Sequence, residues 1–526
     1  MNLAKVLIAN RGEIAVRVAR ACHELGLRSV AVYSEADAGA PHVRAADEAV
    51  AIGPADATRS YLDVDALLVA CEATGADALH PGYGFLAENA EFARLVEAAG
   101  LVFVGPPPAA IAAMGDKTAA RARMIAAGVP VVPGTERALE DAGEAATAAE
   151  EIGYPVLLKA AAGGGGKGMR IVESAAGLGS AFEAAGREAA QAFGDGRVYL
   201  ERYLARPRHI EIQVLADAHG RLIHLGEREC SIQRRHQKLI EEAPSPALDA
   251  DLRARMGAVA CEAARAVDYV GAGTVEFLFE DGEFWFLEMN TRIQVEHPVT
   301  ELVTGVDLVQ WQLRIAGGER LDVPDEAARP RGHAIECRIG GEDPAAGFLP
   351  ATGTVRAVDL PAGPGVRWDG GVEAGTEVGL HYDPLLGKLL AWAPTRTGAI
   401  ERMKRALGEL RISGVRTTIP FHSAVMDEPD FRAGDLSIRY VERHPRLVEA
   451  AGEWTRDAAL AAAGWLEHVR RGGGAGEWVG PVAGRPAEVA TGPAGRSATV
   501  GARPGTPAAE RSAERSAWQR ALEDGR

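Results

Sequence analysis

Acidic and amide side chains lie close together in residues 288–298, which read EMNTRIQVEHP. Glu288 and Asn290 are two residues apart at the end of an expected strand, so both point to one face of that strand. A carboxylate beside an amide oxygen is the hard oxygen ligation that Mg²⁺ prefers. Arg292 and Glu296 follow, and they could bind an anion and act as a base. The stretch therefore predicts a metal site with acid–base chemistry beside it.

A third metal ligand is expected from the strand upstream. Residues 274–279 read TVEFLF and carry Glu276, and Asp281-Gly282 can form the turn of a hairpin. A plain two-residue turn would place Glu276 and Glu288 on opposite faces, so a shared metal requires a three-residue turn or a bulge. Taken alone, the pattern is equally compatible with a charged hairpin whose polar face is solvated.

A glycine-rich stretch provides a second signal of chemistry. Residues 162–169 read AGGGGKGM, and consecutive glycines let backbone N–H groups approach phosphate oxygens while Lys167 adds a charge. It is not a Walker A loop, because Gly168 stands where Ser or Thr would be needed. A lone glycine run is usually a linker, but Lys159 upstream and the carboxylate hairpin downstream favour a flexible flap over a nucleotide.

Three further polar stretches accompany the hairpin. Residues 201–204 (ERYL) could read adenine with backbone groups, or could simply join two units. Residues 233–238 (QRRHQK) are a solvated basic face or a ribose or anion site, and their place in an acidic chain favours the site. Residues 333–338 (HAIECR) form an expected strand in which Arg338 is a surface ion pair or a second anion clamp.

The elements that must position these residues begin with an alternation of strands and helices. Residues 3–9 and 29–33 are expected strands, and residues 12–25 an expected helix with apolar positions at helical spacing. This α/β (α+β) pattern implies a doubly wound parallel sheet. Residues 9–12 (ANRG) stand where a dinucleotide loop would, but they lack G-x-G-x-x-G, which weakens a nicotinamide hypothesis.

Five segments are expected along the chain. They are an N-terminal sheet domain (1–127), a small lid with the glycine loop (128–203), a body with the metal hairpin (204–329), a β-rich closing domain (330–446) and an Ala/Gly/Arg-rich tail (447–526). In the tail, Trp454, Leu460 and Trp465 could mark one short helix, and the chain beyond Arg471 is expected to be largely disordered.

Composition excludes several classes of function. At 526 residues with 47% hydrophobic and 25% charged residues, the chain is globular and long enough for several domains. A net charge of −16 argues against general nucleic-acid binding. No apolar run is long enough for a membrane span, no signal-peptide pattern opens the sequence, and the five cysteines form no C-x-x-C pair. A cytoplasmic enzyme with reduced thiols is expected.

Taken together, these stretches resemble the biotin carboxylases of the ATP-grasp superfamily, over about residues 1–446. The resemblance is specific, because the glycine loop, QRRHQK and EMNTRIQVEHP occur in the same order. It implies an ATP-grasp fold with lid and body, ATP and Mg²⁺ (or Mn²⁺) as cofactors, and usually a homodimer. Arg202, where a lysine is common, and Gly340-Gly341 depart from the family pattern and put only local geometry in doubt.

The resemblance also implies a role for each matching residue. Lys117 and Lys159 resemble nucleotide ligands, and the phosphate flap comprises Gly164, Gly165, Gly166, Lys167, Gly168 and Met169. Glu201, Leu204, His209, Gln233, His236 and Ile438 resemble the adenine and ribose site, and Glu276, Glu288 and Asn290 the metal ligands. Lys238, Arg292, Gln294 and Val295 resemble the bicarbonate site, Glu296 the base, Arg338 the group that stabilises the biotin enolate, and Tyr83 a biotin contact.

The expected function is the MgATP-dependent carboxylation of biotin by bicarbonate, as the first half-reaction of an acyl-CoA carboxylase of the acetyl- or propionyl-CoA type. The biotin is expected on a separate carrier protein, with a separate carboxyltransferase, and the final acceptor stays open. One alternative is another ATP-grasp ligase that activates bicarbonate or a carboxylate. A non-catalytic ATP-binding or scaffold protein is disfavoured, because Glu296, Lys238 and the metal ligands are all present.

Overall fold

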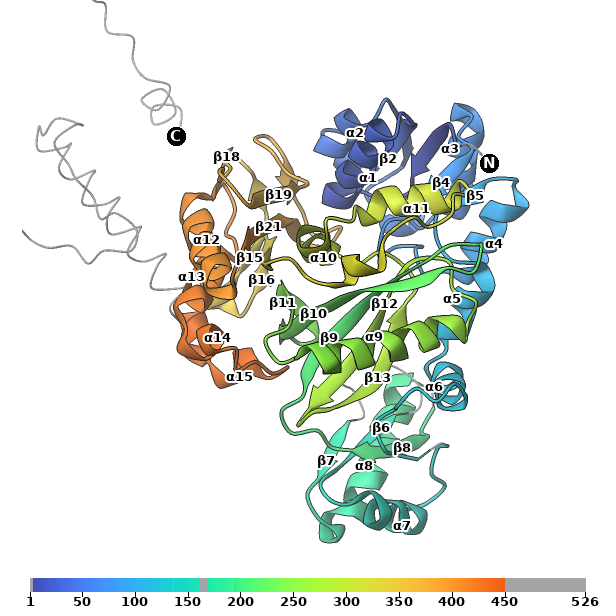
Figure 1. The fold of residues 1–526 in the computed structure, drawn as a ribbon, viewed down its shortest axis with the longest axis vertical. Helices are drawn as coiled ribbons and strands as arrows, with labels where there is room; N and C mark the ends of the chain where they lie inside the picture. Colours follow the sequence, from blue (N-terminus) through green and yellow to red (C-terminus); the bar gives the residue numbers. More distant parts are fainter. Residues whose placement is uncertain (1–2, 136, 161–168, 194, 450–526) are drawn as a thin grey trace, which may run out of the picture. The chain divides into compact units, whose positions relative to one another are not determined.

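The computed structural model describes residues 3–135, 137–160, 169–193 and 195–449 (Figure 1). Contacts divide the chain into Met1–Leu466 and Glu467–Arg526, and all described residues belong to the first unit. The flap residues Gly164 to Gly168 lie outside the described residues, as do the expected tail helix and the disordered end. Among the described residues, no helix is long and apolar enough to cross a membrane.

The N-terminal sheet is parallel and has five strands in the order β3-β2-β1-β4-β5. Its strands are β1 (Lys5–Ile8), β2 (Arg28–Ser34), β3 (Glu48–Gly53), β4 (Ala78–His80) and β5 (Val102–Phe103). The helices between and after them are α1 (Gly12–Glu24), α2 (Pro41–Ala45), α3 (Val64–Thr74), α4 (Ala90–Ala98) and α5 (Pro108–Gly115). The expected doubly wound sheet is confirmed.

Strand order reverses between β1 and β4, which are neighbours in this sheet. The loops that leave the carboxyl ends of such neighbouring strands separate and leave a crevice, where α/β sheets bind ligands. Residues 9–12 follow β1 and residues 81–84 follow β4. Because both loops lie at this crevice, Tyr83 comes close to the start of α1.

A small antiparallel sheet of three strands, in the order β7-β6-β8, forms the region expected as a lid. After α6 (Lys117–Ala126), this region contains α7 (Ala142–Ile152), β6 (Val156–Ala160), β7 (Arg170–Val172), α8 (Ala175–Phe193) and β8 (Val198–Arg202). Its own core includes the buried Val156, Leu158 and Leu200. The predicted flap connects β6 to β7, so its placement between two strands is confirmed.

The largest sheet has eight strands in the order β13-β12-β9-β10-β11-β14-β21-β19, and its neighbouring strands are antiparallel. They are β9 (Arg208–Ala216), β10 (Leu222–Arg234), β11 (Gln237–Ala243), β12 (Gly271–Glu280), β13 (Glu283–Asn290), β14 (His333–Gly340), β19 (Val366–Gly370) and β21 (Leu385–Ala393). Helices α9 (Ala250–Arg265), α10 (His297–Thr304) and α11 (Leu308–Ala316) contact it. Since β11 pairs with β14, the sheet runs across the predicted boundary between residues 329 and 330.

The remaining described elements surround β21 and the loops beyond it. They are β15 (Glu342–Asp343), β16 (Leu349–Pro350), β17 (Gly353–Thr354), β18 (Ala357–Asp359), β20 (Glu377–Val378), α12 (Arg396–Glu409), β22 (Arg411–Ser413), α13 (Ile419–Asp427), α14 (Pro429–Ala433) and α15 (Tyr440–Arg443). Helix α12 packs on β21, where Met403 and Leu407 are buried with Ile335 and Leu389. This region therefore holds more helix than the β-rich pattern suggests.

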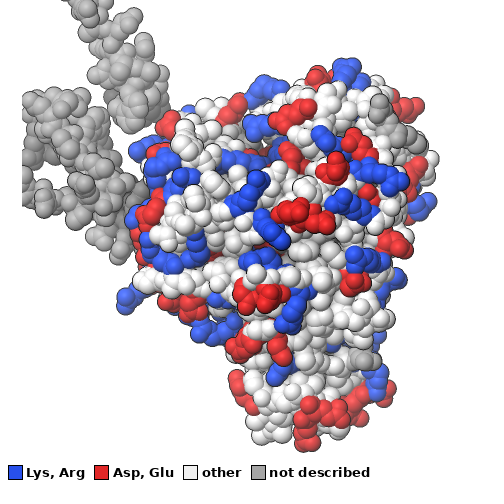
Figure 2. Space-filling model, in the orientation of Figure 1, with Lys and Arg blue, Asp and Glu red and all other residues white. Residues whose placement is uncertain are grey.

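Charged residues form a row on one face of the eight-stranded sheet. Glu288, Glu276, Glu211 and Arg228 stand directly opposite one another on β13, β12, β9 and β10. On the outside, Figure 2 shows acidic and basic side chains interspersed over the visible face. A row of charges inside a sheet is expensive unless it is paired, so the partners of these four side chains matter.

Candidate active site

One cleft gathers almost all of the predicted site residues. It is lined by Tyr83, Lys159, Met169, Glu201, Leu204, His209, Gln233, His236, Lys238, Glu276, Glu288, Asn290, Arg292, Gln294, Val295, Glu296, Arg338 and Ile438. The flap glycines and Lys167 lie outside the described residues, as does the side chain of Lys117, whose backbone begins α6. The lining comes from the parallel sheet, the lid and the eight-stranded sheet, so the site forms where these three regions meet.

The β12–β13 hairpin contains a bulge, which is one of the two arrangements, a three-residue turn or a bulge, that a metal shared by Glu276 and Glu288 would require. A two-residue turn places Glu280 opposite Glu283, and the register then shifts so that Glu276, not its neighbour, stands opposite Glu288. Leu287 is the extra residue, between the pairs Phe277–Phe286 and Glu276–Glu288. The shift brings both carboxylates to one face, and the predicted alternative of a bulge is confirmed.

Glu276 is buried and surrounded by donors. Its Oε1 accepts hydrogen bonds from Lys238 Nζ at 2.9 Å, Asn290 Nδ2 at 2.8 Å and Gln294 Nε2 at 2.8 Å. Its Oε2 forms an ion pair with His209 Nε2 at 2.9 Å. Burial alone would raise the pKa of Glu276, but Lys238 and His209 outweigh it and hold the pKa well below its usual value. Glu276 is therefore a carboxylate.

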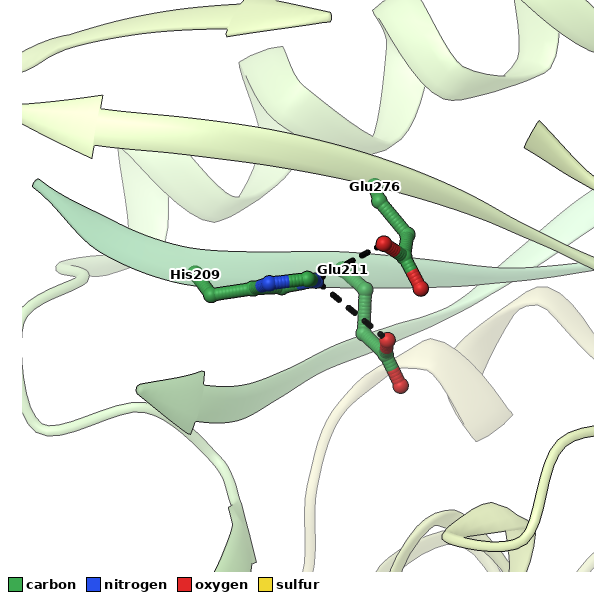
Figure 3. A group of neighbouring side chains, drawn as sticks. All are labelled: His209, Glu211 and Glu276. Atoms are coloured by element: carbon green, nitrogen blue, oxygen red, sulfur yellow. Dashed lines mark ion pairs between the residues drawn. The ribbon is translucent and has the colours of Figure 1, made fainter. Parts of the chain in front are cut away.

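His209 lies beside two carboxylates, that of Glu211 on its own strand β9 and that of Glu276 on the neighbouring strand β12 (Figure 3). Glu211 Oε2 lies 4.0 Å from His209 Nε2, farther than the oxygen of Glu276. Burial would lower the pKa of His209, yet the Glu276 and Glu211 carboxylates raise it above its ordinary value. The imidazole is therefore paired with the hairpin carboxylate of Glu276 and lies close to that of Glu211.

Lys238 joins three carboxylates at the centre of the cleft. Its Nζ lies 2.6 Å from Glu211 Oε2, 2.9 Å from Glu276 Oε1 and 2.6 Å from Glu296 Oε1. Burial favours the neutral amine, but these three carboxylates raise the pKa of Lys238 well above its usual value. The ammonium is thus a permanent charge, aligned by Glu211 and Glu276.

Glu296 lies between two cations. Its Oε2 accepts a 2.8 Å hydrogen bond from Arg338, opposite the contact with Lys238. Burial would raise the pKa of Glu296, but Lys238, Arg338 and Arg228 depress it strongly. Glu296 therefore rests as the carboxylate, the form that can accept a proton. It directly precedes α10, where His297 Nδ1 lies 2.7 Å from the Gln294 carbonyl oxygen and fixes the turn.

Arg338 has a second carboxylate partner that the sequence did not single out. Its Nε donates to Glu241 Oε1 at 2.6 Å, and Glu241 lies on the adjacent strand β11. Burial and the Glu296 charge raise the pKa of Glu241 to about 7, although Arg338 acts in the opposite direction. Arg338 is thus held between two carboxylates, with its guanidinium at the cleft.

Arg228 supports the site from within the sheet. Its side chain is fully buried and bonds Glu211, Gln213 Oε1 at 2.6 Å and Gln294 Oε1 at 2.8 Å. It thereby aligns Glu211, the partner of Lys238, and Gln294, which lies two residues before Glu296. Arg292 makes its own bonds nearby, to Glu88 Oε2 at 3.0 Å and Asn290 Oδ1 at 3.1 Å.

The lid end of the cleft holds a second lysine. Lys159 Nζ donates to Glu201 Oε2 at 2.9 Å, and these residues lie on the neighbouring lid strands β6 and β8. The burial of Lys159 would lower its pKa, but Glu201 raises it above the usual value. A cation from the lid therefore faces the cleft beside the segment expected to bind adenine.

Sequence reasoning missed Glu211, Arg228 and Glu241. A signal was present, because each is a charged residue within a strand whose residues the sheet mostly buries. Without knowledge of strand order, such charges could not be assigned to one face. They became part of the site only through the register of β9, β10 and β11.

Three family models match the chain in order. They are "Biotin carboxylase, N-terminal domain" at residues 2–111, "Carbamoyl-phosphate synthase L chain, ATP binding domain" at 116–323, and "Biotin carboxylase C-terminal domain" at 336–443. Biotin carboxylase of Nostoc sp. is 54% identical over 443 residues, covering 84% of this chain and 99% of the relative. A pyruvate carboxylase component of Methanothermobacter thermautotrophicus is 54% identical over 447 residues, covering 85% and 91%.

A solved structure shares the fold at similar identity. The biotin carboxylase domain dimer of 2-oxoglutarate carboxylase from Hydrogenobacter thermophilus, in complex with MgADP, ADP and bicarbonate, is 50% identical with a TM-score of 0.78. The match covers 85% of this chain and 99% of that chain. Fold and cleft together define an ATP-grasp ligase.

The chain belongs to the biotin carboxylase family. It is an ATP-dependent ligase, and the predicted family, ATP-grasp fold class and enzyme class are confirmed. The predicted cofactors, ATP and Mg²⁺, are those of the family. The individual residue roles rest on the geometry above and are taken up as proposals.

Proposed function

We propose that this chain carboxylates biotin on a separate carrier protein, using MgATP and bicarbonate, as the first half-reaction of an acyl-CoA carboxylase. The observation that carries the proposal is the buried Glu296 carboxylate, held between Lys238 and Arg338 beside the Glu276–Glu288 hairpin. A base, two fixed cations and a hard oxygen site in one cleft suit the activation of a small oxyanion by ATP.

The hairpin fits a magnesium ion by its donor set. Glu276 and Glu288 offer carboxylate oxygens from one face, and Asn290 adds an amide on the same strand as Glu288. Asn290 Oδ1 accepts one hydrogen bond from Arg292 here, and its second lone pair could still ligate a cation. Bound there, Mg²⁺ would neutralise charge on the ATP phosphates.

Bicarbonate binding requires the ion pairs of the cleft to exchange partners. In this structure, Lys238 and Arg338 are each paired with carboxylates. A bicarbonate held by Lys238, Arg292 and Gln294 would compete with Glu296 for the hydrogen bonds that the cations of the cleft donate. As Glu296 loses such bonds, its pKa rises and it becomes a stronger base. Glu296 then takes the bicarbonate proton, and the anion attacks the γ-phosphate to give ADP and carboxyphosphate.

The second part of the reaction is proposed to take place beside Arg338. Carboxyphosphate is unstable in water, which gives a lid over the site a clear purpose. Its breakdown releases phosphate and supplies carbon dioxide beside biotin. The phosphate can take the ureido N–H proton of biotin, while Arg338 holds the charge that develops on the ureido oxygen before the nitrogen attacks carbon dioxide. Tyr83 lines the same cleft and is assigned to the wall that contacts biotin.

Partners, location and segment boundaries belong to the same proposal. We infer a homodimer, a separate biotin carrier, a separate carboxyltransferase and a cytoplasmic location. We also propose the five segments 1–127, 128–203, 204–329, 330–446 and 447–526 as the working division of the chain, with one sheet shared by the third and fourth. The Hydrogenobacter relative is named as a domain dimer, which supports the homodimer.

Relatives named for other carboxylases keep a second acceptor class open. One belongs to a pyruvate carboxylase and another to a 2-oxoglutarate carboxylase, both at 50% identity or more. These names favour a keto acid as the alternative to an acyl-CoA. The proteins that co-purify with the chain would identify the carboxyltransferase and decide between the two.

The proposed reaction is tested by its products. Purified protein is incubated with MgATP, labelled bicarbonate and free biotin, and carboxybiotin is measured together with ADP and phosphate. Carboxybiotin in proportion to ADP supports the proposal. Label transferred to ammonia or to an aminoimidazole instead would favour another ATP-grasp ligase, and ATP cleavage that ignores both bicarbonate and biotin would refute the carboxylase assignment.

A further inference from the structure

A buried lysine, Lys388, is the neighbour of Arg338 on the adjacent strand of the sheet. In the sheet register, Lys388 on β21 stands opposite Arg338 on β14, and Asp369 on β19 stands opposite Lys388. The Lys388 side chain has no exposed surface and is not part of the cleft lining. A fully buried ammonium is costly unless it is well paired, so its contacts carry information about its role.

Lys388 connects two walls of the cleft. Its Nζ donates a 2.8 Å hydrogen bond to the backbone carbonyl of Val295, the residue before the base Glu296. The same Nζ lies 3.0 Å from Glu13 Oε1 at the start of α1. Glu13 Oε1 in turn accepts the hydroxyl hydrogen bond of Tyr83. One ammonium thus joins the turn that carries the base to the tyrosine at the biotin end.

The surrounding charges keep this lysine protonated. Burial alone would lower the pKa of Lys388, but Glu13, Glu336 and Asp369 raise it above the ordinary value. Its hydrogen bonds are therefore charge-assisted and stronger than neutral ones. The Val295 carbonyl has a strong donor just before α10, so the position of Glu296 depends on a residue that does not touch the substrate.

We propose that Lys388 is a positioning residue for biotin carboxylation: it fixes the Val295–Glu296 turn for bicarbonate and, through Glu13, fixes Tyr83 for biotin. The inference rests on the proposed function. A cation that only stabilises the fold would not act on particular substrates. A positioning role for Lys388 instead requires that its loss affect the bicarbonate and biotin sites separately and leave the nucleotide site unchanged.

The test compares Lys388→Met, which keeps side-chain length without the charge, with Lys404→Met as a matched control. Lys404 lies on α12 with 44% of its side chain exposed and pairs with Asp427. We expect Lys388→Met to raise the KM values for bicarbonate and biotin roughly tenfold or more, the scale for a lost supporting contact. The KM for ATP should stay at the wild-type value, and the control should change none of the three.

A second variant separates the two links. Glu13→Gln keeps the side-chain shape but weakens the pairing with Lys388 and Tyr83, while the bond from Lys388 to Val295 remains. It should raise the KM for biotin and leave that for bicarbonate near wild type. Calorimetric titration with bicarbonate in the presence of MgADP gives a readout independent of turnover, and Lys388→Met should weaken that binding by a similar factor.

The outcomes are distinguishable. Equal KM values in Lys388→Met and Lys404→Met, or an equal rise in the KM for ATP, would overturn the inference, even if the melting temperature falls. If Lys388→Met does not fold, an unchanged biotin KM in Glu13→Gln overturns it. A wild-type protein without biotin carboxylation would instead refute the proposed function, and the bicarbonate titration would still decide the role of Lys388.

Discussion

At the scale of single residues, the site is defined by how each charge is paired. Glu296 is ionised because Lys238 and Arg338 flank it, and Lys238 is charged because Glu211 and Glu276 align it. No group in this set acts alone, so removal of one partner leaves a buried charge without compensation. Each of these charges therefore matters to the stability of the fold as well as to the proposed chemistry.

Replacing the proposed base tests the centre of this set. Glu296→Ala should lower bicarbonate- and biotin-dependent ATP cleavage by roughly a hundredfold or more, the usual scale for a lost general base. Steady-state rates measure the effect, with the exposed Glu97→Ala as control. Near-normal turnover in Glu296→Ala would remove Glu296 from the mechanism.

Arg338 should act mainly in the transition state. In Arg338→Ala, the rate of biotin carboxylation should fall about a hundredfold while ATP affinity holds, because the enolate charge develops only during reaction. Carboxybiotin formation and nucleotide binding are measured in parallel, with Arg94→Ala on the surface as control. An equal loss of ATP affinity would place Arg338 in the nucleotide site instead.

At the scale of elements, strand register decides which side chains meet. The bulge at Leu287 brings Glu288 opposite Glu276, and the pairing of β14 with β11 brings Arg338 to Glu241. Helix α10 helps to position Glu296, which directly precedes its first residue and lines the cleft. The metal hairpin and the junction of β11, β14 and α12 can each be tested at this scale.

Glu288→Gln removes one charged ligand from the proposed hard-cation site. It should raise the magnesium concentration needed for half-maximal turnover about tenfold while the protein stays folded, since the side chain keeps its shape. Activity titrated against magnesium measures the change, and Glu97→Gln is the matched control. A magnesium requirement no greater than that of the control would mean that the hairpin is not the metal site.

Glu242 gives a stability prediction with a defined pH window. Burial would raise its pKa, but His333 and Arg396 lower it from 4.5 to about 2, so β11, β14 and α12 are joined by one carboxylate. Because the pKa of Glu242 is lower in the folded than in the unfolded protein, the ionised carboxylate stabilises the folded protein at pH values above the unfolded-state pKa. This contribution of about 3 kcal/mol is lost as pH falls from about 5 towards 2. Denaturant unfolding at several pH values should show that slope.

The matched comparison for that slope is Glu242→Gln, which should be less stable at pH 7 and should depend less on pH below 5. Glu97→Gln, at an exposed position on α4, should keep the wild-type slope. If Glu242→Gln and Glu97→Gln have the same pH dependence, the carboxylate does not link the three elements as described.

At the scale of the whole molecule, the chain should not carry its own biotin. Covalent biotin is attached to a lysine, and Lys404, within α12, is the last lysine of the sequence. The residues after it contain none, so the tail cannot be a working carrier. We expect no streptavidin signal after expression beside an active biotin ligase, whereas a stoichiometric covalent signal would contradict a separate carrier.

The sequence alone predicted the class of chemistry and the order of the candidate residues along the chain. The candidate hard-oxygen pair Glu288 and Asn290 and the candidate base Glu296 were predicted from residue types and short spacing. The doubly wound sheet follows from alternation of strands and helices, and even the need for a bulge or a three-residue turn follows from the period of two in a strand.

Only the tertiary structure decided which distant charges meet. Glu13 and Lys388 are far from Arg228 and Glu241 in the sequence, and none of the four carries a local pattern that marks it as part of one site. Their meeting depends on strand order and register across two sheets, and these are fixed by burial of the whole core rather than by any short segment. Glu296 could therefore be predicted as a candidate base from the residues next to it in the sequence, whereas the residues that hold it in place could not be predicted.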